Sequence, residues 1–97
     1  MIDLKNKVIM ISGANRGIGY ATAKLLKEKG CILSLGARNP DEIKVGGDNV
    51  LKCMWDAKEK KLSKNWVSET ISHFDKIDGL VMNLSLIHIS EPTRRAL

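Results

Sequence analysis

The chain has 97 residues, which is the size of about one ordinary domain. Hydrophobic residues make up 43% of it and charged residues 28%, a composition typical of a globular protein rather than a disordered one. The formal net charge of +5 comes from lysines and acids that alternate along the chain, with one basic cluster at Lys58–Lys61. We therefore expect a solvated helix face there and no nucleic-acid surface.

The sequence argues against a membrane protein, a secreted disulfide-bonded protein and a metalloprotein. No apolar run approaches the ~20 residues of a membrane span, and the run after Asp3 is too short for a signal peptide, so we expect a cytoplasmic protein without membrane contact. Cys31 and Cys53 lie in apolar runs without C-x-x-C spacing, which indicates core thiols in a reducing compartment. His88 has no partner at ligand spacing, so we expect no metal site.

The first part of the chain predicts a strand, a helix and a second strand. Lys7–Gly13 and Cys31–Ala37 are short, nearly continuous apolar runs, the pattern of strands that are buried on both faces. Between them a helix begins near Ile18, and Gly30 ends it as the residue after the C-cap. The residues that we expect on the inner face of this helix are Ile18, Ala21, Thr22, Leu25 and Leu26.

The rest of the chain repeats this alternation. Asn39 and Pro40 predict the start of a short helix, Glu42 is expected to complete a capping box, and Gly46–Gly47 end it. The elements that follow are a third strand at Asn49–Trp55, a helix at Lys58–Phe74 and a fourth strand at Ile77–Asn83. The residues expected on the inner face of the long helix are Leu62, Val67, Thr70, Ile71 and Phe74.

This order of elements predicts an α/β fold. Apolar strands that alternate with helices through short connections are parallel, with right-handed crossovers and helices on both faces of the sheet. We therefore expect residues 1–83 to form the N-terminal part of a doubly wound parallel sheet, ending after its fourth strand.

The first predicted strand leads into the sequence SGANRGIG at Ser12–Gly19, which enters the first helix directly. Gly13 allows a sharp exit from the strand, Gly17 has no side chain to obstruct a phosphate, and Gly19 allows close helix–strand packing. The N–H groups of the first helical turn, with the helix dipole, favour an anion. Because the glycines lie between a buried strand and an amphipathic helix, the motif predicts a dinucleotide site.

SGANRGIG resembles the TGxxxGIG cofactor motif of the short-chain dehydrogenases/reductases, and the resemblance extends over Lys5–Asn83. The stretches GARN, WDA and IDGLVMN match further family positions. The resemblance implies a Rossmann fold, a nicotinamide dinucleotide cofactor, hydride transfer to or from a carbonyl or alcohol substrate, and a homo-oligomeric parent protein. The residues that it assigns to the cofactor are Gly13, Asn15, Arg16, Gly17, Ile18, Gly19, Arg38, Asp56, Ala57 and Asn83.

The end of the second predicted strand indicates NADP rather than NAD. An NAD site has a carboxylate there for the ribose hydroxyls, whereas this chain has Ala37 followed by Arg38. Arg16 is expected near the same ribose, and two guanidinium groups suit a 2′-phosphate. The alternative is that Arg38 only extends its side chain into solvent. Asp41 and Glu42 lie nearby in sequence but are expected to face a helix N-terminus.

Two aromatic residues need separate interpretation. Tyr20 and Lys24 have the Tyr-x-x-x-Lys spacing of the family's catalytic pair, but they lie on the first helix, behind the phosphate loop. We therefore expect no catalytic residue in this chain and no activity from the chain alone; the alternative function is a non-catalytic, regulatory dinucleotide-binding module. Trp55 either flanks the adenine or packs at a strand end.

The last fourteen residues, Leu84–Leu97, differ in kind from the rest. After Asn83 the family pattern continues with Ala-Gly, whereas here LSLIHISEPTR follows. This stretch resembles the translation of a common transposase-type sequencing adapter. We therefore expect 84–97 to be a non-native tail; the alternative is a divergent natural one.

Overall fold

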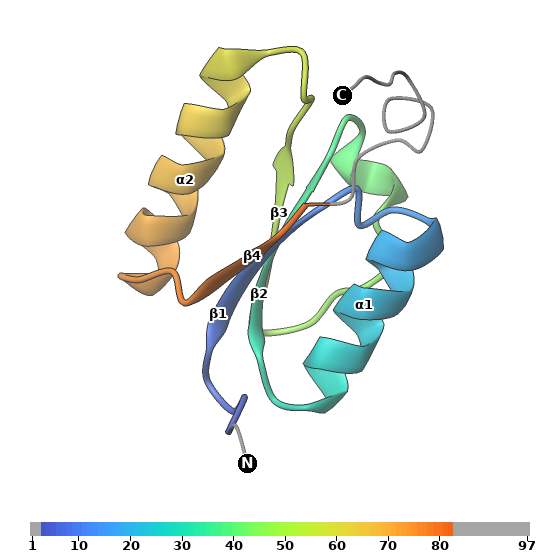
Figure 1. Cartoon of the computed structure of the whole chain (residues 1–97), viewed down its shortest axis with the longest axis vertical. Helices are drawn as coiled ribbons and strands as arrows, with labels where there is room; N and C mark the ends of the chain where they lie inside the picture. The colour runs from blue at the N-terminus through green and yellow to red at the C-terminus, as the bar shows by residue number, and fades with distance from the viewer. Residues whose placement is uncertain (1–2, 83–97) are drawn as a thin grey trace, which may run out of the picture.

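A parallel sheet of four strands runs through the centre of the computed structural model, which describes residues 3–82 (Figure 1). The sheet has the order β3-β2-β1-β4, with α1 and η1 on one face and α2 on the other. The doubly wound α/β fold that the sequence predicts is therefore confirmed. Its elements are β1 (Val8–Ser12), α1 (Gly17–Glu28), β2 (Ile32–Ala37), the 3-10 helix η1 (Pro40–Glu42), β3 (Val50–Met54), α2 (Lys60–Phe74) and β4 (Gly79–Val81).

Strands form at all four predicted places, with bounds that differ slightly from the predicted ones. The fourth is the shortest, and Asn83, the last residue of its predicted range, lies outside the described residues. The predicted stop at Gly30 is confirmed: its φ is +89°, and its N–H donates to the carbonyl oxygen of Lys27 at 3.0 Å. Neither α1 nor α2, the two α-helices of residues 3–82, has the length and apolar character that crossing a bilayer requires.

The predicted short helix after β2 is a single 3-10 turn, η1, rather than an α-helix. Asn39 caps it as predicted, because its side-chain oxygen accepts a hydrogen bond from the N–H of Asp41 at 3.2 Å. The predicted capping box is wrong, since the carboxylate of Glu42 instead accepts a hydrogen bond from the side-chain amide of Asn15 at 3.3 Å. Ile43 follows in an extended conformation and ends the turn.

The inner face of α1 is only partly as predicted, since Leu26 packs against the aliphatic core and Thr22 is half-buried. Gly19 and Ala23 are buried, while Ile18 and Leu25 are 72% and 53% exposed, and Ala21 is exposed as well. The apolar residues of this helix extend around too much of its surface to specify one side. Gly19 lies on the buried side, where the helix comes too close to the carbonyl oxygen of Gly13 for any side chain.

The inner face of α2 is also only partly as predicted. Thr70 is buried as expected, but Trp66, which the helical pattern did not single out, is the large buried side chain, at 3% exposure. Val67 and Ile71, expected inside, are 40% and 47% exposed. The indole of Trp66 packs against Trp55 and Gly36 and is bonded to Ser34.

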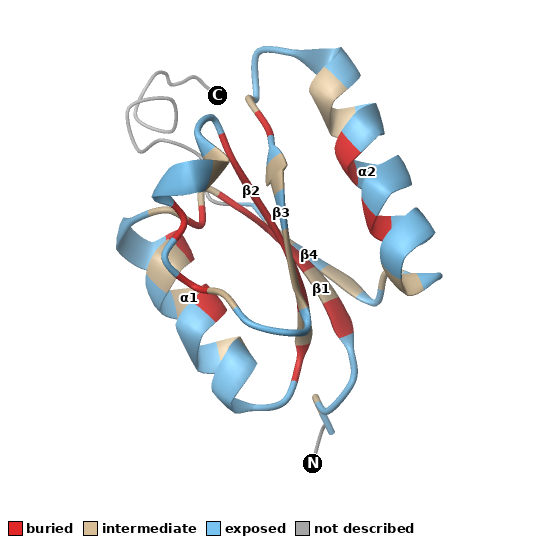
Figure 2. Ribbon diagram, turned by 180° about the vertical axis from the view of Figure 1, so that it is seen from behind, coloured by how far each residue is buried: buried red, intermediate tan, exposed pale blue. Residues whose placement is uncertain are grey.

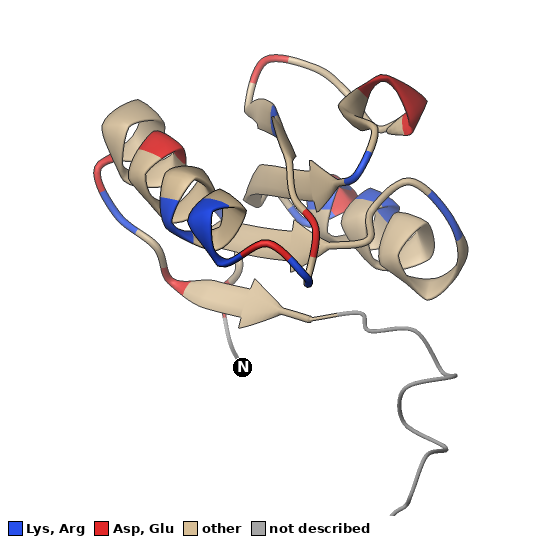
Figure 3. Cartoon of the chain, turned by 90° about the horizontal axis from the view of Figure 1, so that it is seen from above, with Lys and Arg blue, Asp and Glu red and all other residues tan. Residues whose placement is uncertain are grey.

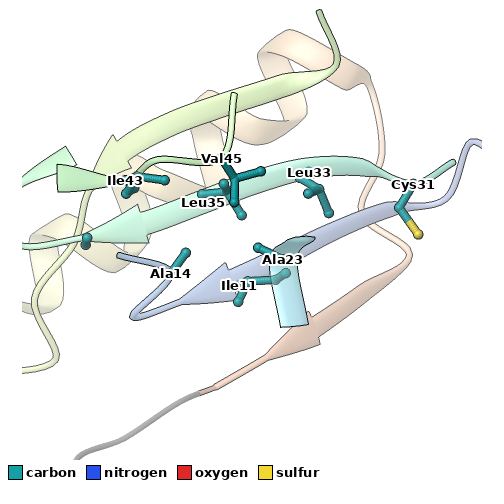
Figure 4. Close-up of a cluster of buried hydrophobic side chains, with 9 residues drawn as sticks. Ile11, Ala14, Ala23, Cys31, Leu33, Leu35, Ile43 and Val45 are labelled. Carbon is teal, nitrogen blue, oxygen red and sulfur yellow. The ribbon is translucent and has the colours of Figure 1, made fainter. Parts of the chain in front are cut away.

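The two faces of the sheet have separate cores, and buried residues lie along the strands and on the inner sides of the helices (Figure 2). The α1 side is aliphatic (Figure 4), whereas the α2 side is built around two tryptophans. The buried residues of the α1 side are Ile11, Ala14, Ala23, Cys31, Leu33, Leu35, Ala37, Ile43 and Val45, and those of the α2 side are Met10, Trp55 and Trp66.

Asp78 attaches the edge strand β4 to β1. Its backbone N–H donates to the carbonyl oxygen of Val8, and its carboxylate accepts from the N–H of Val8, each at 2.8 Å. The bond from Val8 and the neighbouring Lys76, 3.1 Å away, hold the pKa of this carboxyl below its usual value. The ionised carboxylate therefore stabilises the start of the β1–β4 pairing.

A buried chain of hydrogen bonds attaches α2 to β2. The indole Nε1–H of Trp66 donates to the hydroxyl of Ser34 at 2.8 Å, and the two hydroxyls of Ser34 and Thr70 are 2.6 Å apart. Thr70 donates its own proton to the backbone carbonyl of Trp66 at 2.7 Å, so Ser34 is the donor between the hydroxyls. Each polar side-chain hydrogen of these three buried residues thus has an acceptor.

We expect Ser34→Ala to lower the free energy of unfolding by about 1–3 kcal/mol, because it leaves the buried indole N–H of Trp66 without its acceptor. Urea denaturation of the 97-residue chain measures this. Ser68→Ala, at an exposed position of α2, is the matched control and is expected to change stability by less than about 0.5 kcal/mol. Equal losses in the two variants would show that the buried hydroxyl contributes no net stability.

Candidate functional site

The candidate site lies at the edge of the sheet where the strands end. The register pairs Ser12 with Gly36 and Ala37 with Met54, so the segments that follow β1, β2 and β3 leave the sheet at the same edge. Successive strands from β1 to β3 are added on one side, whereas β4 lies on the other side of β1. The edge beside β1 is therefore a topological switch point, the place where open α/β sheets bind ligands.

Two hydrogen bonds hold the glycine loop against the end of β2. The N–H groups of Gly13 and Ala14 both donate to the carbonyl oxygen of Gly36, at 2.8 and 3.3 Å. Gly13 has a φ of +65° and Gly17 a φ of +62°, conformations that glycine adopts without strain. Ala14 is fully buried between them in sequence, so the loop is anchored to the core as well as to β2.

The loop and the first turn of α1 approach each other as closely as a backbone allows. A Cβ atom at position 19 would overlap the carbonyl oxygen of Gly13, an approach that real Cβ atoms do not show. Only glycine therefore permits this arrangement. This contact joins α1 to the loop after β1, whereas the sequence predicts that Gly19 allows close packing of the helix on the strand.

The start of α1 is free of internal caps. Arg16 occupies the N-cap position, its side chain makes no capping hydrogen bond, and the first turn carries no acidic residue. The N–H groups of Gly17, Ile18 and Gly19 precede the first complete helical turn and have no intrahelical acceptor. With the helix dipole, which amounts to about half a positive charge at this end, they form an anion-binding group.

The charged residues around this edge include both signs. Arg16 and Arg38 are exposed, and neither forms a salt bridge within residues 3–82. The expectation that Glu42 faces a helix N-terminus is wrong: its carboxylate lies beside the glycine loop, bonded to Asn15 at 3.3 Å. Figure 3 views the chain from above and shows η1 in red, among loops and helices that carry residues of both signs.

The segment after β3 contributes the remaining predicted residues that the structure describes. Asp56 is half-buried, and one carboxylate oxygen accepts from the N–H of Lys58 at 3.0 Å; Ala57 is exposed. Trp55 packs at the strand end rather than standing free for an adenine: it is 8% exposed, and its Nε1–H donates to Ser63 at 3.0 Å. Asn83 lies outside the described residues.

The Tyr-x-x-x-Lys pair lies on α1, in the first two turns of the helix. Tyr20 is half-buried and packs against the aliphatic core, while Lys24 is exposed one turn further along the helix. The two cysteine thiols are also not activated for reaction. Burial raises the pKa of the thiols of Cys31 and Cys53, so both stay protonated as core residues.

Two residues of the edge were missed by sequence reasoning. Gly36 could have been noticed, because an isolated glycine inside a strand indicates a close approach of backbone or side chains. Glu42 gave no such signal, since its contact with Asn15 joins two loops that are 27 residues apart.

Comparison with known proteins identifies relatives that match most of this chain in sequence. A family model described as short chain dehydrogenase matches residues 7–96. The chain is 35% identical over 93 residues to an uncharacterized oxidoreductase of Listeria monocytogenes, covering 89% of this chain and 38% of that protein. It is 34% identical over 89 residues to 11-beta-hydroxysteroid dehydrogenase-like 3 of Arabidopsis thaliana, covering 84% and 29%.

Solved structures agree with these sequence relatives. A 3-ketoacyl-(acyl-carrier-protein) reductase from Brucella melitensis, complexed with NADH, superposes with a TM-score of 0.75 at 28% identity, over 79% of this chain and 34% of that one. A short chain dehydrogenase/reductase from Burkholderia phymatum, in complex with NAD, gives 0.70 at 25% identity, over 82% and 31%. The chain thus spans about a third of the length of these relatives.

We expect Gly19→Ala to lower the free energy of unfolding by at least about 2 kcal/mol, because the added Cβ overlaps the carbonyl oxygen of Gly13 and forces the loop and α1 apart. Urea denaturation of the chain measures the loss. Gly46→Ala is the control: the nearest atom to its Cβ would be the Lys52 amine at 3.8 Å, so a change of less than about 1 kcal/mol is expected. Similar stabilities for both variants would contradict the close approach.

Proposed function

The chain belongs to the short-chain dehydrogenase family, and from that premise we propose that it forms the adenosine and pyrophosphate end of a nicotinamide dinucleotide site in an oxidoreductase. The observation that carries the proposal is the uncapped start of α1, held against the glycine loop by the contact between Gly19 and Gly13. The presence of NADH and NAD in two structural neighbours supports it.

The chain's own residues bind and orient the cofactor. The N–H groups of Gly17–Gly19 donate to the pyrophosphate, and the lack of a side chain at Gly17 lets the phosphate approach the backbone. Asp56, at the end of β3, accepts a hydrogen bond from the adenine, with Ala57 and Asn83 lining the cofactor further along. The bound nicotinamide supplies the hydride chemistry.

The activity itself belongs to a longer protein. Since the chain covers 38% of the Listeria relative, we propose that the substrate pocket and the catalytic residues lie in parts of the protein outside this chain. That residues 1–83 are the evolved part of the chain is proposed from the sequence pattern alone, because the family model matches residues 7–96 and marks no boundary after Asn83. The parent protein transfers a hydride between the nicotinamide and a carbonyl or alcohol carbon and forms a homo-oligomer. The free thiols Cys31 and Cys53 fit a cytoplasmic location.

We propose NADP as the preferred cofactor. Arg16 precedes the anion-binding turn of α1, and Arg38 follows the end of β2, so both extend from the edge that receives the adenosine ribose. Ala37 provides no carboxylate at the strand end. Guanidinium groups bind phosphate through paired, charge-assisted hydrogen bonds, which gives the 2′-phosphate its advantage over a hydroxyl.

In the full-length protein, NADPH is expected to bind more tightly than NADH, and Arg38→Ala is expected to weaken NADPH binding about tenfold or more, by removing a charge-assisted hydrogen bond. Fluorescence titration with each cofactor measures both affinities. Lys29→Ala removes one positive charge at the opposite end of α1 and serves as control. Equal affinities of the unmutated protein for NADPH and NADH would contradict the proposed preference for NADP.

Tyr20→Phe in the full-length protein is expected to keep the turnover number within a few-fold of the original, because Tyr20 packs against the core and does not reach the reacting atoms. Steady-state kinetics with saturating cofactor tests this. A loss of several orders of magnitude at unchanged cofactor affinity would assign the catalytic role to Tyr20 and Lys24 after all.

A further inference from the structure

The carboxylate of Glu42 occupies a position that the family motif does not describe. Its Oε1 atom accepts a hydrogen bond from Nδ2 of Asn15 at 3.3 Å, and both side chains reach solvent. Asn15 precedes Arg16 in the glycine loop, and Glu42 ends the 3-10 turn that begins two residues after Arg38. An acidic group on the segment that follows Arg38 therefore lies beside the residue that precedes Arg16.

The backbone holds Glu42 in this place. Its N–H donates to the carbonyl oxygen of Asn39 at 3.0 Å, and the next residue, Ile43, is 2% exposed in the aliphatic core. The carbonyl oxygen of Ile43 also accepts from the amine of Lys52 on β3 at 2.8 Å. Because the chain is fixed on both sides of Glu42, its backbone stays close to the glycine loop, within reach of Asn15.

We propose that Glu42 is a specificity-determining residue that opposes the 2′-phosphate and limits the preference for NADP over NAD. This inference rests on the proposed function. A carboxylate beside the ribose repels a dianionic phosphate, whereas it can accept a hydrogen bond from a ribose hydroxyl. Glu42 thus performs from η1 the role of the acid that is missing at Ala37, and the two arginines act against it.

The effect is expected to be moderate because the group is exposed. Solvent screens a carboxylate at the surface, so removing it changes the affinity for a dianion by about three- to tenfold rather than by orders of magnitude. The effect is also expected to shrink as the salt concentration rises. A ligand without the 2′-phosphate feels little of this repulsion.

The test compares two nucleotides that differ only in the 2′-phosphate: adenosine 5′-monophosphate and adenosine 2′,5′-bisphosphate. Titrations of the 97-residue chain, followed by calorimetry or by amide chemical shifts, give both affinities. Glu42→Gln is expected to raise the affinity for the bisphosphate about three- to tenfold relative to the monophosphate. Asp41→Asn is the matched control, since it removes the same charge one residue earlier in η1, and its affinity ratio is expected to stay unchanged.

Each other outcome has a definite meaning. If both nucleotides bind but Glu42→Gln leaves their affinity ratio unchanged, the inference is wrong and the proposed function stands. If Asp41→Asn changes the ratio as much as Glu42→Gln, the effect is one of net charge, and the assignment to Glu42 is likewise wrong. If the folded, unmutated chain binds neither nucleotide, the proposed function itself fails.

Discussion

The carbonyl oxygen of Gly36 accepts two hydrogen bonds from the glycine loop, and the positions of the loop and of α1 follow from them. The donors are the N–H groups of Gly13 and Ala14. Because these bonds fix the loop on the end of β2, the carbonyl of Gly13 points to a place where only a glycine at position 19 can pass. The free N–H groups at the start of α1 are thereby held at the edge of the sheet, ready for an anion without further rearrangement.

The same residue also determines the packing on the opposite face of the sheet. A Cβ at Gly36 would lie 3.0 Å from atoms of both Trp55 and Trp66, whose ring centroids are 5.6 Å apart. The absence of a side chain lets both indoles lie close to β2, with Trp66 bonded to Ser34. One glycine thus takes part in the anchoring of the loop through its carbonyl oxygen and in the packing of α2 through its missing side chain, and a larger residue there would press on the two indoles.

The sequence predicted those parts of the fold that depend on local pattern. Apolar runs located the strands, and Gly30 located the end of α1, because strand burial and helix termination leave their own signals in a few consecutive residues. The rotation of α1 was not predictable in this way. Ile18 and Leu25 follow helical spacing as well as Ala23 does, and the choice between them comes from a contact with a loop rather than from the helix.

The candidate site likewise has features that local sequence predicts and features that it does not. Its geometry comes from glycines and buried residues, which a motif can specify because few residue types fit. Its charge comes from exposed side chains, Arg16, Arg38 and Glu42, that different segments bring to one edge. These can be exchanged without disturbing the sheet, since none of the three is buried. In the proposed site, the geometry that would hold a dinucleotide is therefore tied to the fold. The proposed choice between its phosphorylated and unphosphorylated forms would instead depend on a balance of surface charges that only the tertiary arrangement reveals.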